Sequence, residues 1–287
     1  MPLVTRFAPS PTGSLHLGHA FSALFASEAA RAGGGRFLLR IEDIDPVRCR
    51  PEFTEAIFED LRWLGLTWEE PVLRQSGHME DYAAALAKLS AMGLLYPCFC
   101  TRREIEAEVA ASAAAPHLAL HGPDGPVYPG TCRARGPDER AARLSRNEAA
   151  SWRLDAAKAF AMTGPLFWSD RAAGRIEAAP LDFGDVVLAR KDAPASYHLA
   201  VAVDDHRQGV TLVTRGADLF RATDIQRLLQ ALLGYAPPDY HHHGLLTDAA
   251  GRRFAKRDRD VTLRGLREAG KTAAEVRDMA ARIARQR

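Results

Sequence analysis

The segment RFAPSPTGSLHLGH, residues 6–19, constrains the fold of this chain more than any other stretch. A short apolar segment, residues 3–8, precedes a loop rich in proline and glycine, and helical spacing of apolar residues begins near residue 15. A strand, a loop and a helix in this order place free N–H groups and partial positive charge at the helix N-terminus, which favours phosphate. The candidate N-caps of this helix are Ser10, Thr12 and Ser14.

Two histidines mark the start of the same helix. His16 and His19 are three residues apart, so their side chains project from one face of the first turn. Imidazole groups beside a phosphate can stabilise the charge that develops at phosphorus, and Gly18 leaves room for a flat purine or ribose. From spacing alone, two exposed histidines on a capped helix remain an equal alternative.

The rest of the pattern predicts an α/β fold. Residues 36–45 are predicted as a second strand, which completes a βαβ unit, and residues 51–66 and 79–95 as helices. Residues 98–135 carry cysteines, an alanine-rich stretch and turn residues, which indicates an inserted module. Beyond the insertion we expect three strands, at residues 185–190, 197–205 and 209–216, and a helix at residues 224–234. The basic tail is expected to form one or two further helices.

Composition limits the class of protein. The 287 residues are 47% apolar and 26% charged, enough to bury a substantial core. We find no secretory leader pattern and no apolar run long enough to cross a membrane, so we expect a cytoplasmic protein. Residues 252–287 carry a surplus of seven positive charges, which suits a polyanion such as a nucleic acid, although a solvated arginine-rich helix gives the same pattern.

These motifs carry a family resemblance. HLGH resembles the HIGH signature of class I aminoacyl-tRNA synthetases, and residues 6–19 together with LLRIEDID are similar to the glutamyl and glutaminyl branch. Because the chain ends about thirty residues after its signature loop, it is most similar to the truncated relatives that lack a large anticodon-binding part. The resemblance covers nearly the whole chain. It implies an α/β class I core, Rossmann-like with a parallel sheet, an inserted zinc-binding lobe and a C-terminal helical segment.

The resemblance also implies an activity. It indicates an ATP-dependent ligase that activates L-glutamate to glutamyl-adenylate, releases pyrophosphate and transfers glutamate to queuosine in the anticodon loop of tRNA(Asp). Two alternatives stay open: a compact glutamyl-tRNA synthetase that charges the acceptor end, and an inactive synthetase-like RNA-binding module. The implied domains are residues 1–97 and 136–240 for the two parts of the catalytic core, 98–135 for the zinc-binding insertion, and 241–287 for the signature loop and basic tail.

The family's glutamate site maps onto two parts of the chain. The first strand and its loop are expected to line the pocket with Arg6, Phe7, Ala8, Pro9 and Ser10. Arg6 is expected to pair with the substrate's side-chain carboxylate and Glu42 to bind its ammonium group, in keeping with the chemistry of the two groups. The resemblance implies that Tyr197 and Arg215 complete the site, while we assign the aspartates Asp43, Asp45, Asp204 and Asp205 to caps or ion pairs.

The nucleotide site has a second element. RRFAKRD, residues 252–258, resembles the family's KMSKS loop, and Lys256 matches the second lysine, which contacts ATP. Arg253, Phe254 and Ala255 depart from that pattern, but the positive charge is kept. The resemblance therefore implies that ATP, bound with Mg²⁺, contacts His16, Gly18, His19 and Lys256, and that the two histidines and the lysine are catalytic.

The insertion resembles the family's zinc knuckle. The implied ligands of one structural Zn²⁺ are Cys98, Cys100, Tyr128 and Cys132, and His117 or His121 remain alternatives to the tyrosine. Cys49 stands apart and is expected to be inert. Three consecutive histidines at 241–243 cannot all reach one ion from an extended chain, so we expect adenine contacts, backbone contacts or plain surface there.

Overall fold

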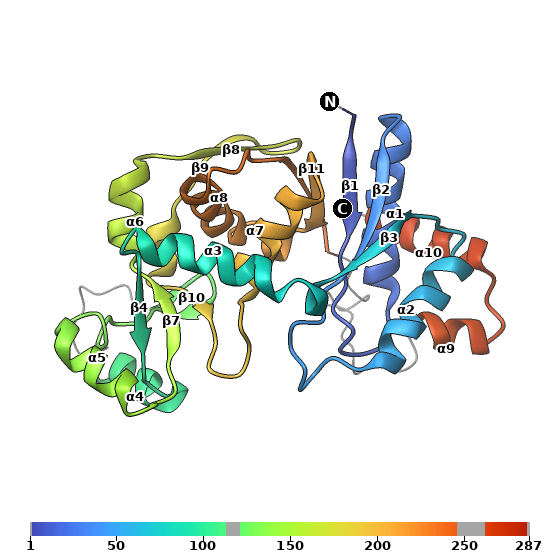
Figure 1. Ribbon diagram of the computed structural model, residues 1–287. Coiled ribbons are helices and arrows are strands. Elements are labelled where there is room, and N and C mark those ends of the chain that lie inside the picture. Colours follow the sequence, from blue (N-terminus) through green and yellow to red (C-terminus); the bar gives the residue numbers. More distant parts are fainter. Residues whose placement is uncertain (1, 113–120, 246–261, 286–287) are drawn as a thin grey trace.

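The computed structural model describes residues 2–112, 121–245 and 262–285 (Figure 1). The N-terminal unit contains β1 (Val4–Phe7), α1 (Leu17–Ala32), β2 (Arg36–Ile41), α2 (Pro51–Trp63) and β3 (Glu69–Arg74). The strands are parallel in the order β1-β2-β3, which confirms the predicted βαβ unit. Helix α1 packs closely because its buried positions are small: Ala20, Ala23, Ala26 and Ala30.

A second parallel unit lies beside the first. It contains β11 (Leu212–Gly216), α8 (Ala222–Leu233), β12 (Asp239–His243) and β8 (Phe167–Asp170), with β9 (Gly174–Glu177) antiparallel at the edge. Helix α8 is buried along most of its length and ends at Gly234, whose left-handed conformation (φ 76°) suits glycine. An apolar core surrounds this unit, and another fills the N-terminal unit.

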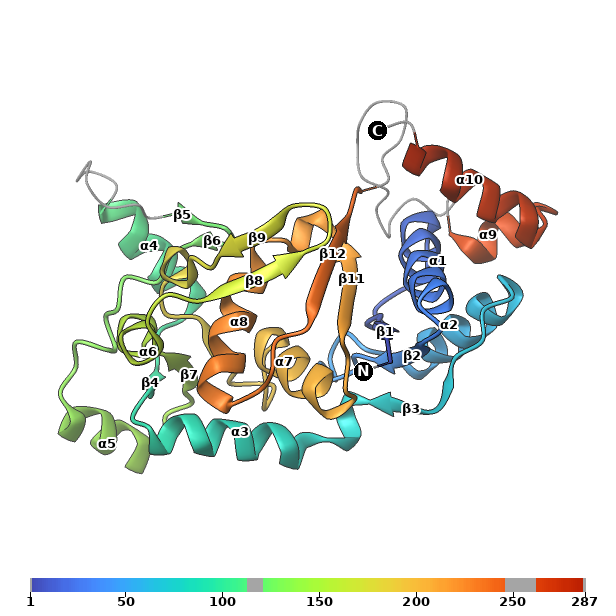
Figure 2. The ribbon, with the colours of Figure 1, turned by 90° about the horizontal axis from the view of Figure 1, so that it is seen from above.

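Strands β1 and β11 join the two units. The amide N of Thr211 donates to the carbonyl O of Val4 at 3.0 Å, and the amide N of Val4 donates to Thr211 Oγ1 at 2.8 Å. The strand order across the molecule is therefore β3-β2-β1-β11-β12-β8-β9, and the two strands lie side by side in Figure 2. The chain runs outward from this junction on both sides, from β1 to β2 and β3 and from β11 to β12, while β8 and β9 come earlier in the chain than β11. Ligands of open α/β sheets bind at the carboxyl ends of strands at such a switch point.

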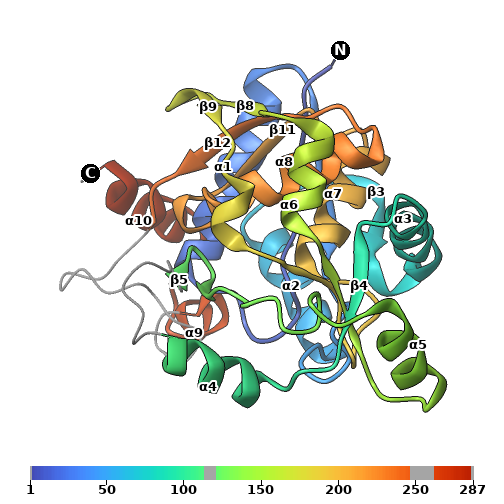
Figure 3. The same cartoon turned by 90° about the vertical axis from the view of Figure 1, so that its left-hand side faces the viewer.

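The remaining elements form the middle and the far end of the molecule. Helices α3 (Met79–Ala91), α6 (Ala156–Thr163) and α7 (Tyr197–Arg207) pack around α8, next to an antiparallel sheet of β10 (Val187–Ala189), β7 (Ser151–Leu154) and β4 (Leu95–Cys98). Short 3-10 turns cover Gln75–Gly77, Pro180–Phe183 and Ala217–Leu219. The insertion holds α4 (Arg102–Ser112), β5 (His121–Gly122), β6 (Gly125–Pro126) and, just beyond it, α5 (Pro137–Ser145); it faces the viewer in Figure 3.

Two C-terminal helices pack against the N-terminal unit. They are α9 (Leu263–Glu268) and α10 (Ala273–Arg285), and α10 packs against α1 through Val276 and Ala280. Among the described segments, no helix combines the length and apolar character needed to cross a bilayer.

One predicted strand is wrong. Residues 197–205 form most of helix α7, and every residue from Leu199 to Asp205 is buried. A helix that is buried on all sides has no polar stripe, so its sequence shows a continuous apolar run that cannot be distinguished from a buried strand. The predicted helices at 51–66, 79–95 and 224–234 and the strands at 185–190 and 209–216 are confirmed.

Candidate active site

A cavity of about 610 Å³ opens at the carboxyl ends of β1 and β11. Ten of the residues predicted for the site line it: Arg6, Phe7, Ala8, Ser10, His16, Gly18, His19, Glu42, Tyr197 and Arg215. Pro9 is buried beside it, and its carbonyl accepts a hydrogen bond from the amide N of Glu42 at 3.1 Å. Lys256 lies outside the described residues.

The two histidines of the first motif form one structural unit. Nδ1 of His16 accepts from the amide N of Gly18 at 3.1 Å, and Nδ1 of His19 accepts from the amide N of His16 at 3.2 Å. The rings stack with their centroids 3.8 Å apart. Because each Nδ1 accepts a backbone N–H, each neutral imidazole carries its proton on Nε2.

The N-cap of α1 is therefore His16, and the predicted caps are wrong. Residues Ser10, Thr12 and Ser14 lie in the loop before the helix, which begins only at Leu17. A histidine can take this role because its Nδ1 is an acceptor at the same reach as a serine or asparagine oxygen. The cap also fixes the orientation of the ring that faces the cavity.

Gly18 packs directly on this cap. A Cβ at this position would lie 3.0 Å from Cε1 and 3.1 Å from Nδ1 of His16, closer than ordinary van der Waals contact. The glycine therefore allows the His16 ring to lie against the backbone of the first turn. The room that the sequence assigns to a purine is in part occupied by this ring.

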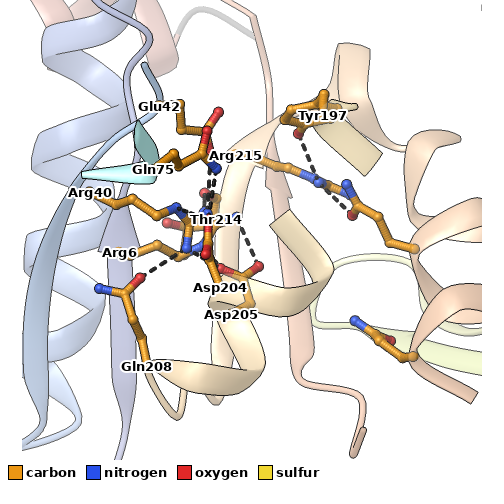
Figure 4. Close-up of polar contacts among 12 residues, drawn as sticks. Arg6, Arg40, Glu42, Gln75, Tyr197, Asp204, Asp205, Gln208, Thr214 and Arg215 are labelled. Atoms are coloured by element: carbon orange, nitrogen blue, oxygen red, sulfur yellow. Dashed lines mark hydrogen bonds and ion pairs between the residues drawn. The ribbon is translucent and has the colours of Figure 1, made fainter. Parts of the chain in front are cut away.

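Arg6 lines the cavity near the end of β1, and its guanidinium is bound by the carboxylate of Asp205. Its Nε and Nη2 donate to Asp205 on α7 at 3.0 and 3.3 Å, and its Nη1 donates to the carbonyl of Thr214 at 3.2 Å. The fully buried Arg40 donates to the same carboxylate at 2.7 Å (Figure 4). Burial alone would raise the pKa of Asp205, but the charges of Arg6 and Arg40 outweigh it and lower the pKa.

Glu42 lies at the other edge of the same charged cluster. Arg40 Nη2 donates to its Oε1 at 3.2 Å, yet burial has the larger effect and raises the pKa of Glu42. Asp204, behind it, accepts from Gln75 at 2.7 Å and from the Tyr82 hydroxyl at 2.9 Å. The contacts of Asp204 join the 3-10 turn and α3 to α7, while Arg40 joins β2 to α7 through Asp205. Glu42 itself lines the cavity.

Arg215 enters from the end of β11 on the opposite wall. Its guanidinium is buried and donates to four neutral acceptors: His242 Nε2 (3.0 Å), Gln226 Oε1 (2.9 Å), Thr223 Oγ1 (2.7 Å) and the Tyr197 hydroxyl (3.4 Å). Within the described part of the chain, Arg215 has no carboxylate within 4.0 Å. The cavity thus lies between two guanidinium groups whose surroundings differ.

The cysteines of the insertion converge as predicted. The Sγ atoms of Cys98, Cys100 and Cys132 all lie within 4.8 Å of one another, and Cys100 and Cys132 are 3.5 Å apart. The Tyr128 hydroxyl is 3.5 Å from Cys100 Sγ, and its ring is buried in the same cluster. Sulfur ligands 2.3 Å from a tetrahedral Zn²⁺ are about 3.8 Å apart, so the donor set fits a closed zinc site. His121 is exposed on β5 and outside this group, and His117 lies outside the described residues.

Comparison with known proteins identifies the family. The model for the catalytic domain of class I tRNA synthetases of the E and Q type matches residues 2–283. The chain belongs to this family. The Glutamyl-Q tRNA(Asp) synthetase of Rhodobacter capsulatus is 51% identical over 96% of this chain and 98% of its own length. That of Nitratidesulfovibrio vulgaris is 44% identical over 97% of this chain and 85% of its own length.

Solved synthetase structures share the fold. A glutamate-tRNA synthetase from Elizabethkingia anophelis aligns over 91% of this chain with a TM-score of 0.77 and 27% identity. A glutamate tRNA ligase from Elizabethkingia meningosepticum, in complex with its amino acid, aligns with a TM-score of 0.76 and 28% identity. The chain spans about half of these two proteins, 54% and 53% of their lengths. The predicted class I synthetase fold and family are confirmed.

The synthetase site also uses residues that the sequence did not single out for it. Asp205 accepts from both Arg6 and Arg40, although we assigned Asp205 to a cap or ion pair and did not consider Arg40. Ser22 and His243 line the cavity and lie 3.0 Å apart; the His243 ring donates from Nδ1 to the Gly244 carbonyl, so its Nε2 accepts from the serine. An arginine at the centre of an apolar strand was the available signal for Arg40.

Proposed function

We propose that the chain activates L-glutamate with ATP and transfers the glutamyl group to queuosine in tRNA(Asp). The proposal is supported by 51% identity to a protein of that name over 98% of its length. The observation that carries it is the single cavity that holds two guanidinium groups and Glu42 beside the His16 and His19 end of α1. Charges that match an acidic amino acid thus adjoin a helix end that favours phosphate.

The first step joins the two substrates. An oxygen of the glutamate α-carboxylate attacks the α-phosphorus of ATP, a C(O)–O–P bond forms, and the bond to the leaving pyrophosphate breaks. His16 and His19 donate through Nε2–H to phosphate oxygens on which negative charge builds up. No protein nucleophile takes part. We expect His19→Ala to reduce glutamate-dependent ATP–pyrophosphate exchange by about 10²- to 10³-fold.

Lys256 is proposed to offset charge on the leaving pyrophosphate. The residues that flank the 246–261 segment support this role, since Leu245 lines the cavity and Thr262 pairs with His16 in a β-bridge. The described residues on either side of the segment, Leu245 and Thr262, therefore lie at or beside the cavity. Mg²⁺ would accompany ATP and neutralise part of its phosphate charge.

Glutamate binding is assigned to both walls of the cavity. Arg6 would receive the side-chain carboxylate, with Arg215 and Tyr197 completing the site, and Glu42 would accept a hydrogen bond from the substrate ammonium. Among the described residues, the Nη1 of Arg6 donates to one neutral carbonyl, that of Thr214, so this end of the guanidinium is the one we assign to the substrate. Phe7, Ala8 and Ser10 supply the wall between them.

The second step needs an approach for the nucleoside. A neighbouring cavity of about 290 Å³ shares Ser10, Glu42 and Tyr197 with the first and is lined by further polar groups, among them Asp45 and Arg190. We assign this side to the acceptor, because a hydroxyl presented there can attack the activated carbonyl. An ester bond to the nucleoside then forms, the carbonyl–oxygen bond to the phosphate breaks, and AMP leaves. Because the acceptor is a tRNA, we place the reaction in the cytoplasm.

The insertion is proposed to be a structural zinc lobe. Cys98, Cys100 and Cys132 with Tyr128 would hold Zn²⁺, which would cross-link the two turns that carry these residues. We keep the division into catalytic core (1–97 and 136–240), zinc lobe (98–135) and signature loop with basic tail (241–287) as part of the proposal. The lobe and the tail would contact tRNA phosphates, so transfer is expected to weaken as salt increases.

A labelling experiment tests the proposal. Radiolabelled glutamate and ATP are supplied with tRNA(Asp) that contains or lacks queuosine, and the label is located by nuclease digestion. Label on the queuosine nucleoside, dependent on that modification, is the expected result. Label on the 3′-terminal adenosine would select a compact glutamyl-tRNA synthetase instead, and absence of glutamate-dependent ATP–pyrophosphate exchange would select an inactive RNA-binding module.

A further inference from the structure

The three consecutive histidines of β12 do not act as one group. His241 and His243 face α1, where their rings contact Phe25 with centroids 4.8 and 5.2 Å away. His242 faces the other side of the sheet and is buried between Asp170 at the end of β8 and Arg215 at the end of β11. This residue thus connects the glutamate cavity with a carboxylate two strands away.

The hydrogen bonds of His242 admit a single tautomer. The Nε of Arg215 is always a donor, so His242 Nε2, at 3.0 Å from it, must accept. The proton is then on Nδ1, which donates to Asp170 Oδ2 at 2.8 Å. Burial first, and then the Arg215 charge, lower the pKa of His242 to about 4 against the opposing effect of Asp170.

Asp170 is itself fixed by the backbone. It accepts from the amide N of Ala172 at 2.8 Å, of Ala173 at 3.0 Å and of His242 at 3.0 Å. The carboxylate, the imidazole and the guanidinium therefore form a chain of hydrogen bonds with a rigid end. Any rotation of the Arg215 side chain about its terminal bonds would break the bond to His242.

The contrast with Arg6 indicates what this chain of groups does. The charge of Arg6 is compensated by direct contact with Asp205, whereas the neutral ring of His242 separates Arg215 from Asp170. A carboxylate in the place of His242 would hold Arg215 equally well. It would also cancel the charge and compete with an anionic ligand for the same donors.

We propose that His242 and Asp170 are positioning residues that keep Arg215 aligned and uncompensated toward the glutamate cavity, and so set the preference for glutamate over glutamine. The inference rests on the proposed function. In this proposal Arg215 shares the substrate's side-chain carboxylate with Arg6. An anionic side chain then gains the attraction of the buried Arg215 guanidinium, while the isosteric amide gains only a hydrogen bond. The preference therefore depends on a charge that the relay orients without neutralising.

Substitutions at His242 separate this role from packing. His242→Phe keeps a ring of similar size but removes the acceptor for Arg215 Nε. His242→Gln supplies a side-chain oxygen near the place of Nε2 and is expected to restore most of the effect. The matched control is His241→Phe, one residue earlier on the same strand, whose ring faces Phe25 and lies outside the cavity lining.

The assay is ATP–pyrophosphate exchange with glutamate and with glutamine. For His242→Phe we expect the ratio of kcat/KM for glutamate to kcat/KM for glutamine to fall by about 10- to 100-fold, the size of effect expected for loss of a hydrogen bond to a charged group. The KM for glutamate should rise, and kcat should change less. His242→Gln should remain within about threefold of the unmodified enzyme, and His241→Phe should match it. An unchanged ratio in His242→Phe, or an equal fall in the control, would overturn the proposal.

A spectroscopic measurement tests the relay itself. In ¹⁵N-histidine spectra, His242 should show the Nδ1–H tautomer and no titration between pH 5.5 and pH 8, given its pKa of about 4. An Nε2–H tautomer, or a pKa near the ordinary value for histidine, would refute the geometry even where His242→Phe fails to fold. Absence of glutamate-dependent exchange in the unmodified enzyme would contradict the proposed function. The measured tautomer of His242 tests the hydrogen-bond chain from Asp170 to Arg215 independently of that activity.

Discussion

Gly18→Ala is expected to affect stability and activity in opposite directions. The new Cβ would lie 3.0 Å from Cε1 of the His16 ring, and ordinary contacts begin near 3.4 Å. The ring must therefore move by about 0.4 Å, or its cap bond to the amide N of residue 18 must lengthen from 3.1 Å. Displacements of about 1 Å at a reacting centre cost about 10²-fold in rate, so we expect a loss of about 5- to 20-fold.

The stability of the same variant should change little or increase. Alanine within a helix is favoured over glycine by up to about 1 kcal/mol, which offsets the strain at the cap. We would measure glutamate-dependent ATP–pyrophosphate exchange and urea unfolding on the same preparation. Gly77→Ala is the control, since a Cβ there meets nothing within 4 Å and the residue lies outside the cavity lining. Undiminished exchange in Gly18→Ala would show that the position of the His16 ring does not limit the reaction.

Three further substitutions test the charged groups and the cysteine cluster. Burial raises the pKa of Asp60 from 3.8 to about 6, so the folded state keeps this proton to a higher pH than the unfolded state and loses stability as the pH rises through this range. In urea unfolding, Asp60→Asn should therefore increase the free energy of unfolding by up to about 3 kcal/mol at pH 7.5 and leave it unchanged at pH 4. Asp205→Asn leaves the buried guanidinium groups of Arg6 and Arg40 without their shared carboxylate. It should lower the free energy of unfolding by about 3 kcal/mol and abolish ATP–pyrophosphate exchange. A variant with unchanged stability and unchanged exchange would contradict the assigned cluster. Cys132→Ser, or chelation, should release one equivalent of zinc by metal analysis and weaken tRNA transfer more than exchange; equal loss of both would place the metal's role in the catalytic core.

The sequence predicted the elements whose polarity follows a simple period. Helices α2, α3 and α8 have apolar residues at helical spacing toward one of the two cores, so their spacing identifies them. Strands β1 and β2 are buried on both faces and were identified as short apolar runs. Helix α7 was mistaken for a strand because it is buried on every side. The junction of β1 with β11 joins residues more than two hundred positions apart, and no local pattern can encode it.

The site was predicted where a motif specifies it and missed where only tertiary structure assembles it. Arg6, Glu42 and Arg215 lie on the cavity wall as the resemblance implies. Their partners could not be identified in the same way, because Asp205 and His242 resemble ordinary helix and strand residues until the fold places them behind the two arginines. The cysteine cluster was implied by the resemblance to the family's zinc knuckle, because two cysteines close in sequence and one across a loop are by themselves only a modest signal of metal binding.

An arginine lies on each side of the switch point, and the two arginines have different electrostatic surroundings. On the β1 side, Arg6 and Arg40 face three buried acids, so the cluster carries its own compensation and holds the sheet to α7 without a ligand. On the β11 side, Arg215 is surrounded by neutral acceptors, and a buried cation of this kind costs stability until an anion arrives. The free energy that this burial costs in folding would be recovered when an anionic ligand binds, and this is the physical basis of the amino-acid preference that we propose for Arg215.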